Sequence, residues 1–256
     1  MAPVYADHPF QLLQTPVYLA KQRDEKTDLF DELASEMVHV HNMIIRGLNS
    51  IYLQAPHIKT ADEKAFCRYI LGWHTLLHEH HDGEEEMLFP YVEKATGVKG
   101  IMEANISQHK DFHESLDAVK NYAEAVLSGT EKHSGDKLVA ILDELGPILT
   151  GHLNNEIPTL LSLRQYADKL ADLPRLFEQE GEKTMKKIGG AGMVFCFANI
   201  DLGFEDNMWP NFPPAPAPVK VFIKNVLWWV HPDVRKFGAV DRSGKLRPLY
   251  AVPESA

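Results

Sequence analysis

The sequence predicts an all-α protein, an antiparallel four-helix bundle with a C-terminal helical and irregular extension. Three observations support this fold class. Four long segments carry apolar residues at helical spacing. The links between these segments are short, which favours helices that run up and down beside one another. Histidines and glutamates recur on the apolar faces of the same four segments, so they would meet inside the bundle.

The bulk composition is that of a soluble globular protein and excludes some partners. The chain has 256 residues, of which 45% are hydrophobic and 24% are charged, enough for one well-buried core and an extension. A formal net charge of −10 without a basic cluster argues against nucleic acid and against anionic membranes as partners. Two distant cysteines and the lack of a secretory signal lead us to expect a cytoplasmic protein without a disulfide scaffold.

The first two bundle helices are expected to follow an N-terminal arm. Residues 1–27 contain three spaced prolines and are expected to form an irregular N-terminal arm. A helical period follows from 28 to 54, and Pro56 ends it. The second helix is expected from 61 to 94, with a bend near Pro90 because proline lacks the backbone N–H of a helix interior.

Two further helices are expected in the second half of the bundle, each after a short loop. A third helix is expected from 101 to 127 and a fourth from 137 to 166. Pro147 and Pro158 lie inside the fourth segment, so a bend or break is expected there. With the first two helices, these segments define a bundle domain over residues 28–166.

The extension, residues 167–256, has a different character. One more helix is expected from 173 to 188, followed by an aromatic segment and the proline-rich run 210–218. A short helix is expected over 219–230; it is apolar but contains lysines and is too short to span a bilayer. The many aromatic residues indicate that the extension packs on the bundle rather than forming a free linker.

A set of candidate metal ligands lies on the apolar stripes of all four bundle helices. Polar groups on such stripes are costly to bury unless something satisfies them. Three helices carry a pair at i, i+4, a spacing that places both side chains on one face. The candidates are His41 on the first helix, His80 and Glu84 on the second, His109 and His113 on the third, and His152 and Glu156 on the fourth.

This donor set predicts two metal ions. Seven protein donors are too many for one tetrahedral zinc, but five imidazoles and two bridging carboxylates can hold a pair of ions. Imidazole with carboxylate suits iron, zinc, copper or manganese better than calcium or magnesium. With a bridging oxygen species, one coordination position would stay open, and on a redox metal dioxygen could bind there.

The rotation of the second helix leaves one alternative open. His80 and Glu84 follow leucines and a tryptophan on their own face, whereas His81 and Glu85 follow further histidines. We therefore expect the first pair to point inward and the second to lie on a solvated face. On this interpretation alanine at His80 or His113 would lower the iron content sharply, and alanine at His81 would not.

The motifs that contain these residues resemble those of the hemerythrin-like (HHE cation-binding) family. They are VHNMIIRGLNSIY, HHDGEEEMLFP, QHKDFH and HLNNEIPTL, and the resemblance covers about residues 30–165, with filamentous-fungal members the most similar. It implies a non-haem di-iron centre, two iron ions with an oxo or hydroxo bridge, held by the seven candidates. In the oxygen-carrying members an aspartate stands five residues after the last histidine. Here Glu156 stands four after His152, which argues against pure oxygen carriage.

The expected function is that of a di-iron oxygenase, a monooxygenase-type oxidoreductase that uses dioxygen and an external reductant. The expected substrate is a small aromatic or aldehyde-type molecule. Aromatic residues of the extension either roof a substrate pocket or only pack the extension onto the bundle: Phe195, Phe197, Phe204, Trp209, Phe212, Trp228 and Trp229. The alternative function is a non-catalytic oxygen carrier, iron store, or oxygen or iron sensor, which needs the same ligands and no pocket.

Overall fold

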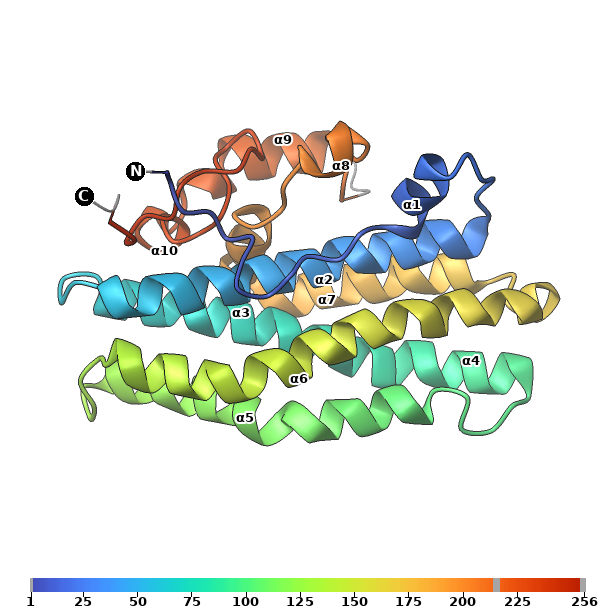
Figure 1. The fold of residues 1–256 in the computed structure, drawn as a ribbon, viewed down its shortest axis with the longest axis horizontal. Coiled ribbons are helices and arrows are strands. Elements are labelled where there is room, and N and C mark those ends of the chain that lie inside the picture. Colours follow the sequence, from blue (N-terminus) through green and yellow to red (C-terminus); the bar gives the residue numbers. More distant parts are fainter. Residues whose placement is uncertain (1, 214–216, 254–256) are drawn as a thin grey trace.

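Four long helical runs form the bundle, as predicted (Figure 1). They are α2 (Leu29–Gln54), α3 (Glu63–Gly83) continued by α4 (Phe89–Thr96), α5 (Glu103–Ser128) and α6 (Gly135–Ser162). The computed structural model describes residues 2–213 and 217–253. Within these ranges the chain is helical with no β-strand, and one isolated antiparallel bridge joins Val240 to Leu246. The all-α bundle is therefore confirmed.

Local side-chain chemistry fixes where the first bundle helix begins. The Asp28 carboxylate accepts hydrogen bonds from the backbone N–H groups of Phe30 and Asp31, and the Asp31 carboxylate accepts one from the Asp28 N–H. This reciprocal cap satisfies donors that have no partner inside the helix. The helix ends at Gln54, two residues before Pro56, as the sequence indicates.

The second predicted helix is interrupted by a π-helical turn at Glu84–Leu88, between α3 and α4. Pro90 lies in the first turn of α4, where its missing N–H leaves one carbonyl of the preceding turn without its usual partner. A π-helical turn shifts the side chains that follow it around the helix axis, and such turns are frequent at functional sites. Its first residue, Glu84, is one of the candidate ligands.

The fourth bundle helix is continuous through its two prolines, where a bend or break was expected. Pro147 and Pro158 lie inside α6 without breaking it, and a 3₁₀ segment, Leu163–Lys169, continues the run. Leu145 and Leu149 on either side of Pro147 are fully buried. The packing of these side chains outweighs the single hydrogen bond that each proline removes, so the helix bends without ending.

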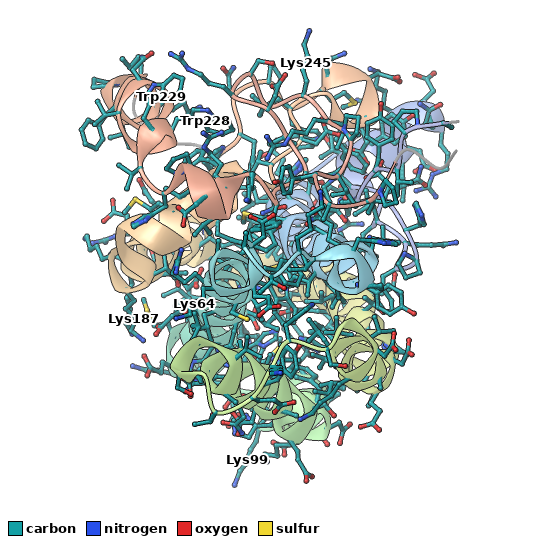
Figure 2. The ribbon with its side chains drawn as sticks, turned by 90° about the vertical axis from the view of Figure 1, so that its left-hand side faces the viewer. Lys64, Lys99, Lys187, Trp228, Trp229 and Lys245 are labelled. Atoms are coloured by element: carbon teal, nitrogen blue, oxygen red, sulfur yellow. The ribbon has the colours of Figure 1, made fainter. Side chains whose placement is uncertain are left out.

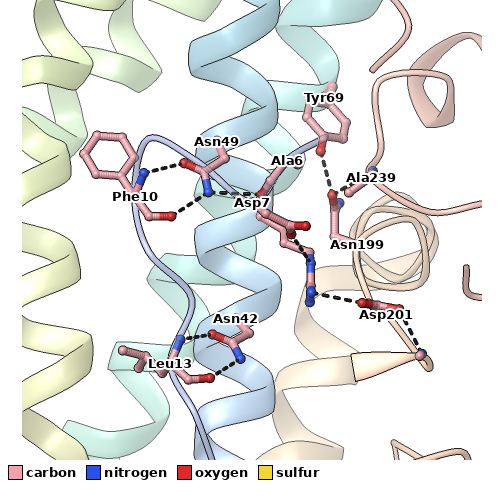
Figure 3. A network of polar contacts seen from close by, with 12 residues as sticks. Ala6, Asp7, Phe10, Leu13, Asn42, Asn49, Tyr69, Asn199, Asp201 and Ala239 are labelled. Atoms are coloured by element: carbon pink, nitrogen blue, oxygen red, sulfur yellow. Dashed lines mark hydrogen bonds and ion pairs between the residues drawn. The ribbon is translucent and has the colours of Figure 1, made fainter. Parts of the chain in front are cut away.

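The N-terminal arm is held along α2 rather than free. Asn42 and Asn49, both buried on α2, form paired hydrogen bonds with the backbone of the arm at Leu13 and Phe10 respectively, at 2.8–2.9 Å (Figure 3). Contrary to the expected irregular arm, a short helix α1 (Pro16–Gln22) forms within it. The two asparagine side chains thus satisfy backbone N–H and C=O groups of the arm, which has no neighbouring strand to bond to in the described structure.

The extension forms helices that cover one side of the bundle. The longest, α7 (Leu173–Phe197), lies along α3 and runs past the predicted end at 188 through a kink at Gly189, whose φ of 60° glycine tolerates. The remaining helices are α8 (Phe204–Asn207), α9 (Ala217–Asn225), a 3₁₀ turn at Leu227–Trp229 and α10 (Pro232–Arg235). Residues 214–216 of the proline-rich run lie outside the described residues. Among the described helices, none has the length and apolar character needed to cross a bilayer.

The aromatic residues of the extension serve mainly to pack it. The Phe195 ring lies 5.0 Å from that of Tyr69 and belongs to the bundle core. Trp209 and Phe212 each lie 4.6 Å from the ring of His39 on the outer face of α2. None of the seven aromatic residues lines either of the two cavities considered below. Their arrangement agrees with the packing interpretation of the aromatic segment, not with a roof over a pocket.

Gly47 on α2 lies where the extension packs closely on the bundle. A Cβ at this position would lie 2.5 Å from the Phe195 ring and 2.7 Å from Trp73. We therefore expect Gly47→Ala to lower the free energy of unfolding by about 1–3 kcal/mol, measured by urea denaturation. The control is Gly181→Ala on α7, where nothing lies within 4 Å of the new Cβ; it should stabilise by about 0.5–1 kcal/mol. Equal effects of the two substitutions would contradict this packing.

Candidate metal centre

A buried polar layer divides the bundle between two apolar clusters. One cluster contains Ile44, Leu48, Trp73, Phe112 and Leu149, and the other contains Phe30, Val38, Leu88, Ile157 and Leu163. Between them lie seven side chains from the four helical runs, each no more than 8% exposed: His41, His80, His81, Glu84, His109, His152 and Glu156. Such a layer is unfavourable in a core unless its polar atoms are satisfied.

The seven side chains form two groups that share one residue. The first group is His41, His80, Glu84 and Glu156, and the second is His81, Glu84, His109 and His152. In each group the ligand atoms lie within 4.8 Å of one another. Each group can therefore hold one metal ion.

Glu84 lies between the two groups with one oxygen toward each. Its Oε1 is 3.2 Å from Nε2 of His80, and its Oε2 is 3.5 Å from Nε2 of His109. Glu156 also faces both groups, since its Oε2 lies 3.3 Å from Nε2 of His41 and 4.0 Å from Nε2 of His152. Both carboxylates therefore lie within reach of both groups.

Hydrogen bonds behind the centre orient three of its imidazoles. Nδ1 of His41 donates to the Leu153 carbonyl at 2.9 Å, and Nδ1 of His152 donates to the Gln108 side-chain oxygen at 3.1 Å. Nδ1 of His109 donates to the Glu85 carboxylate at 2.7 Å. With Nδ1 protonated, each ring presents the lone pair of Nε2 to the interior, which is the arrangement that metal-binding histidines use.

Most inward atoms of the centre have no hydrogen-bond partner, the exception being Nε2 of His109 and of His152, which lie 3.1 Å from each other. These atoms test whether a metal fits. Nε2 of His41, His80 and His81 is buried and unpartnered, as are both carboxylate oxygens of Glu84 and of Glu156. Buried polar atoms are rarely left in this state. A cation at each group would satisfy them all, and the mixture of imidazole and carboxylate fits a first-row transition metal.

Burial keeps two imidazoles of the centre in the neutral form that binds metal, but it favours a proton on one carboxylate. It lowers the pKa of His80 and of His152 to about 3, so both imidazoles are neutral at pH 7. Burial and the neighbouring Glu156 raise the pKa of Glu84 well above its usual value. Burial also acts to raise the pKa of Glu156, but the His41 imidazole, 3.3 Å away, and the other nearby imidazoles bring that pKa down to about 2. The metal-free centre therefore carries a proton on Glu84, which a metal ion must displace.

The structure brings together six of the seven sequence-predicted residues and leaves His113 outside. The His113 side chain is 67% exposed on α5, 3.6 Å from Asp117. The buried positions of α5 continue from His109 through Phe112 and Leu116, so His113 lies beside this stripe rather than on it. The i, i+4 spacing of His109 and His113 did not by itself fix which face of α5 turns inward.

His81 joins the centre instead, which corrects its expected place on a solvated face. It is 7% exposed, and its ring lies 4.3 Å from that of His109. His80 and His81 stand four and three residues before Glu84, and both spacings reach the same face of a helix. The motif HHDGE contained this signal. Glu85, expected beside His81 on the solvated face, is half-exposed and bonds to His109.

Comparisons with known proteins agree with this site. A family model for the hemerythrin HHE cation-binding domain matches residues 32–163, which contain all seven residues of the centre. A protein named "Dimeric xanthone biosynthesis cluster protein R11" from Cryptosporiopsis sp. (strain 8999) is 32% identical over 248 residues. That similarity covers 96% of this chain and 92% of the relative, so it includes the extension as well as the bundle. No solved structure gives a significant match.

Proposed function

This chain belongs to the hemerythrin HHE cation-binding family and is a metal-binding protein, and from that premise we propose that it holds two iron ions and uses dioxygen to oxidise a small organic substrate. The observation that carries the proposal is the pair of donor groups joined by Glu84. A single buried group would fit a structural ion equally well. Two groups with a shared carboxylate suit a pair of ions that exchange electrons together.

The two ions would be held by different numbers of imidazoles. His41 and His80 would hold the first, and His81, His109 and His152 the second, with Glu84 and Glu156 between them. When bound, a pair of redox-active ions supplies the electrons that reduce dioxygen. The protein keeps His80, His81 and His152 neutral, because burial lowers the pKa of each of them. It also limits the access of water, because the buried Phe112 ring lies 5.1 Å from that of His81 and 5.5 Å from that of His152.

The choice of an aromatic substrate rests on the relative, which is named for a dimeric xanthone biosynthesis cluster. Xanthones are fused aromatic compounds, so an aromatic substrate and an external reductant are the natural proposal for this chain. The second candidate is reversible oxygen carriage, iron storage or sensing. The near-complete burial of the centre favours it, since dioxygen can enter where a larger molecule cannot.

Loading with iron separates these candidates. We expect metal-free protein mixed with ferrous salt under nitrogen to bind two iron ions per chain by elemental analysis. On admission of air, an optical band should form and then decay faster when an aromatic substrate is present, with a product that has gained oxygen by mass spectrometry. Zinc-loaded protein is the control, because zinc has no redox chemistry. A band that reverses completely on removal of oxygen, without product, would establish carriage instead.

A further inference from the structure

A cavity lies between α4, the loop that follows it and the start of α5. It has a volume of about 530 Å³, within the range of small-molecule sites. Phe89, Met102 and Ile106 supply its apolar lining, and Glu85, Lys94 and Lys99 supply charged groups. Phe89 and Met102 are themselves almost fully buried, so the apolar wall is a fixed part of the fold.

The inner wall of this cavity is also the outer wall of the metal centre. Glu85 lines the cavity and accepts the hydrogen bond from Nδ1 of His109 at 2.7 Å. Phe89 lines the cavity, and its ring lies 5.8 Å from the His109 ring at an angle of 31°. Both residues belong to the π-helical turn or follow it directly. A molecule in the cavity would therefore contact the two side chains that hold His109 from behind.

Two glutamates and two lysines line the cavity, and in the described structure only the glutamates have hydrogen-bond partners. Glu85 is paired with His109, and the Glu93 carboxylate accepts a hydrogen bond from the backbone N–H of Gly100 at 3.0 Å. Lys94 and Lys99 have no ion-pair or side-chain hydrogen-bond partner in the part of the chain that the structure describes, and both are exposed. Figure 2 shows Lys99 at the edge of the molecule opposite Trp228 and Trp229, so the extension does not cover this side. The two lysines are available to an anionic group.

A second, larger cavity does not have these properties. It lies between the N-terminal arm and α6, with a volume of about 870 Å³. No charged side chain lines it, and in the described structure none of its lining residues hydrogen-bonds to the centre. Of these two cavities, only the one between α4 and α5 combines a contact to the metal centre with lysines that have no partner in the described structure.

We infer that the cavity between α4 and α5 binds a planar aromatic acid, and that Glu85 transmits its binding to the metal centre through His109. The ring of the acid lies against Phe89 and Ile106, and its carboxylate or phenolate meets Lys94 and Lys99. This inference rests on the proposed function and goes beyond it by naming the class of ligand whose binding changes the metal centre. Because the Glu85 carboxylate raises the donor strength of His109, a ligand that moves Glu85 changes the metal environment.

Cobalt(II) in place of iron tests the binding without any turnover. Full-length protein loaded with cobalt(II) is titrated with 2-naphthoate in the absence of oxygen, and the visible bands of the metal are followed. We expect saturable binding with a shift of these bands. The neutral 2-naphthamide, which has the same ring but no charge, should bind roughly tenfold more weakly.

Variants place the binding in this cavity. The double variant Lys94→Gln, Lys99→Gln should weaken 2-naphthoate roughly tenfold, while Lys132→Gln, an exposed lysine far along the chain, should not change it. Ile106→Trp should abolish binding because it fills the cavity. Glu85→Gln should retain binding but reduce the shift of the cobalt bands.

The inference is overturned if the double lysine variant binds like the wild type, if 2-naphthamide binds as tightly as 2-naphthoate, or if 2-naphthoate leaves the cobalt bands unchanged. No oxidation is measured, so loss of the proposed oxygenase function would not affect this result. Conversely, if 2-naphthoate does not bind, this inference is wrong, and the proposed function is still tested by loading the protein with iron.

Discussion

Alanine at position 81 should lower the metal content of the purified protein to about half, whereas alanine at position 113 should leave it unchanged. His81 is buried in the second donor group and its Nε2 has no other partner. His113 is exposed and lies beside Asp117. Removal of a buried ligand loses the ion of that group, while removal of a surface histidine loses a weak contact. Elemental analysis after dialysis against buffer measures both.

A matched control for this comparison is His78→Ala. His78 lies on the same helix, three residues before His81, with a half-exposed side chain near Asp82. Its loss should leave both ions in place. If His113→Ala emptied the site and His81→Ala did not, α5 would have to be rotated about its axis relative to its position here, and the assignment of the second group would be wrong.

Glu84→Gln should weaken metal binding at both groups together, by roughly a hundredfold or more. Glu84 is the residue common to both groups, with one oxygen 3.2 Å from His80 and the other 3.5 Å from His109. A neutral amide cannot bridge two cations, because it has lost the negative charge and one of the two acceptor oxygens. Competition with a coloured chelator measures the affinity of each position.

The same substitution should leave the stability of the metal-free protein nearly unchanged. Burial and Glu156 raise the pKa of Glu84, so its side chain is protonated when no metal is bound, and glutamine has nearly the same shape. Thermal unfolding with and without metal separates the two effects. Glu86→Gln, in the same π-helical turn but with an exposed side chain, is the control and should affect neither. Full retention of two ions by Glu84→Gln would refute a shared carboxylate.

The sequence was sufficient to predict most of the fold and much of the donor set. The apolar stripes of α2, α3, α5 and α6 each pointed to one face, and six candidate residues on those stripes meet in the structure. These stripes repeat over several turns, so an error at one position is corrected by its neighbours. The helix bounds followed in the same way from prolines, caps and loops.

The parts that the sequence could not specify depend on contacts between helices. His81 and His113 were assigned to the wrong sides because a helical period does not define the rotation of a helix about its own axis to within one residue. That rotation is set by partners such as Phe112, whose ring lies 5.1 Å from that of His81. The docking of α7 was likewise beyond prediction, because it depends on Phe195 fitting over Gly47, which is far away in sequence.

The polar layer between the two apolar clusters has a consequence for the protein in the cell. Each cluster can form its own contacts, but the metal-free layer between them contains unpartnered imidazoles and carboxylates. Without ions the two ends of the bundle are joined by their weakest section, which is where transient opening and attack by proteases should begin. The lifetime of the polypeptide, and with it the amount that accumulates, should therefore follow the supply of metal during growth.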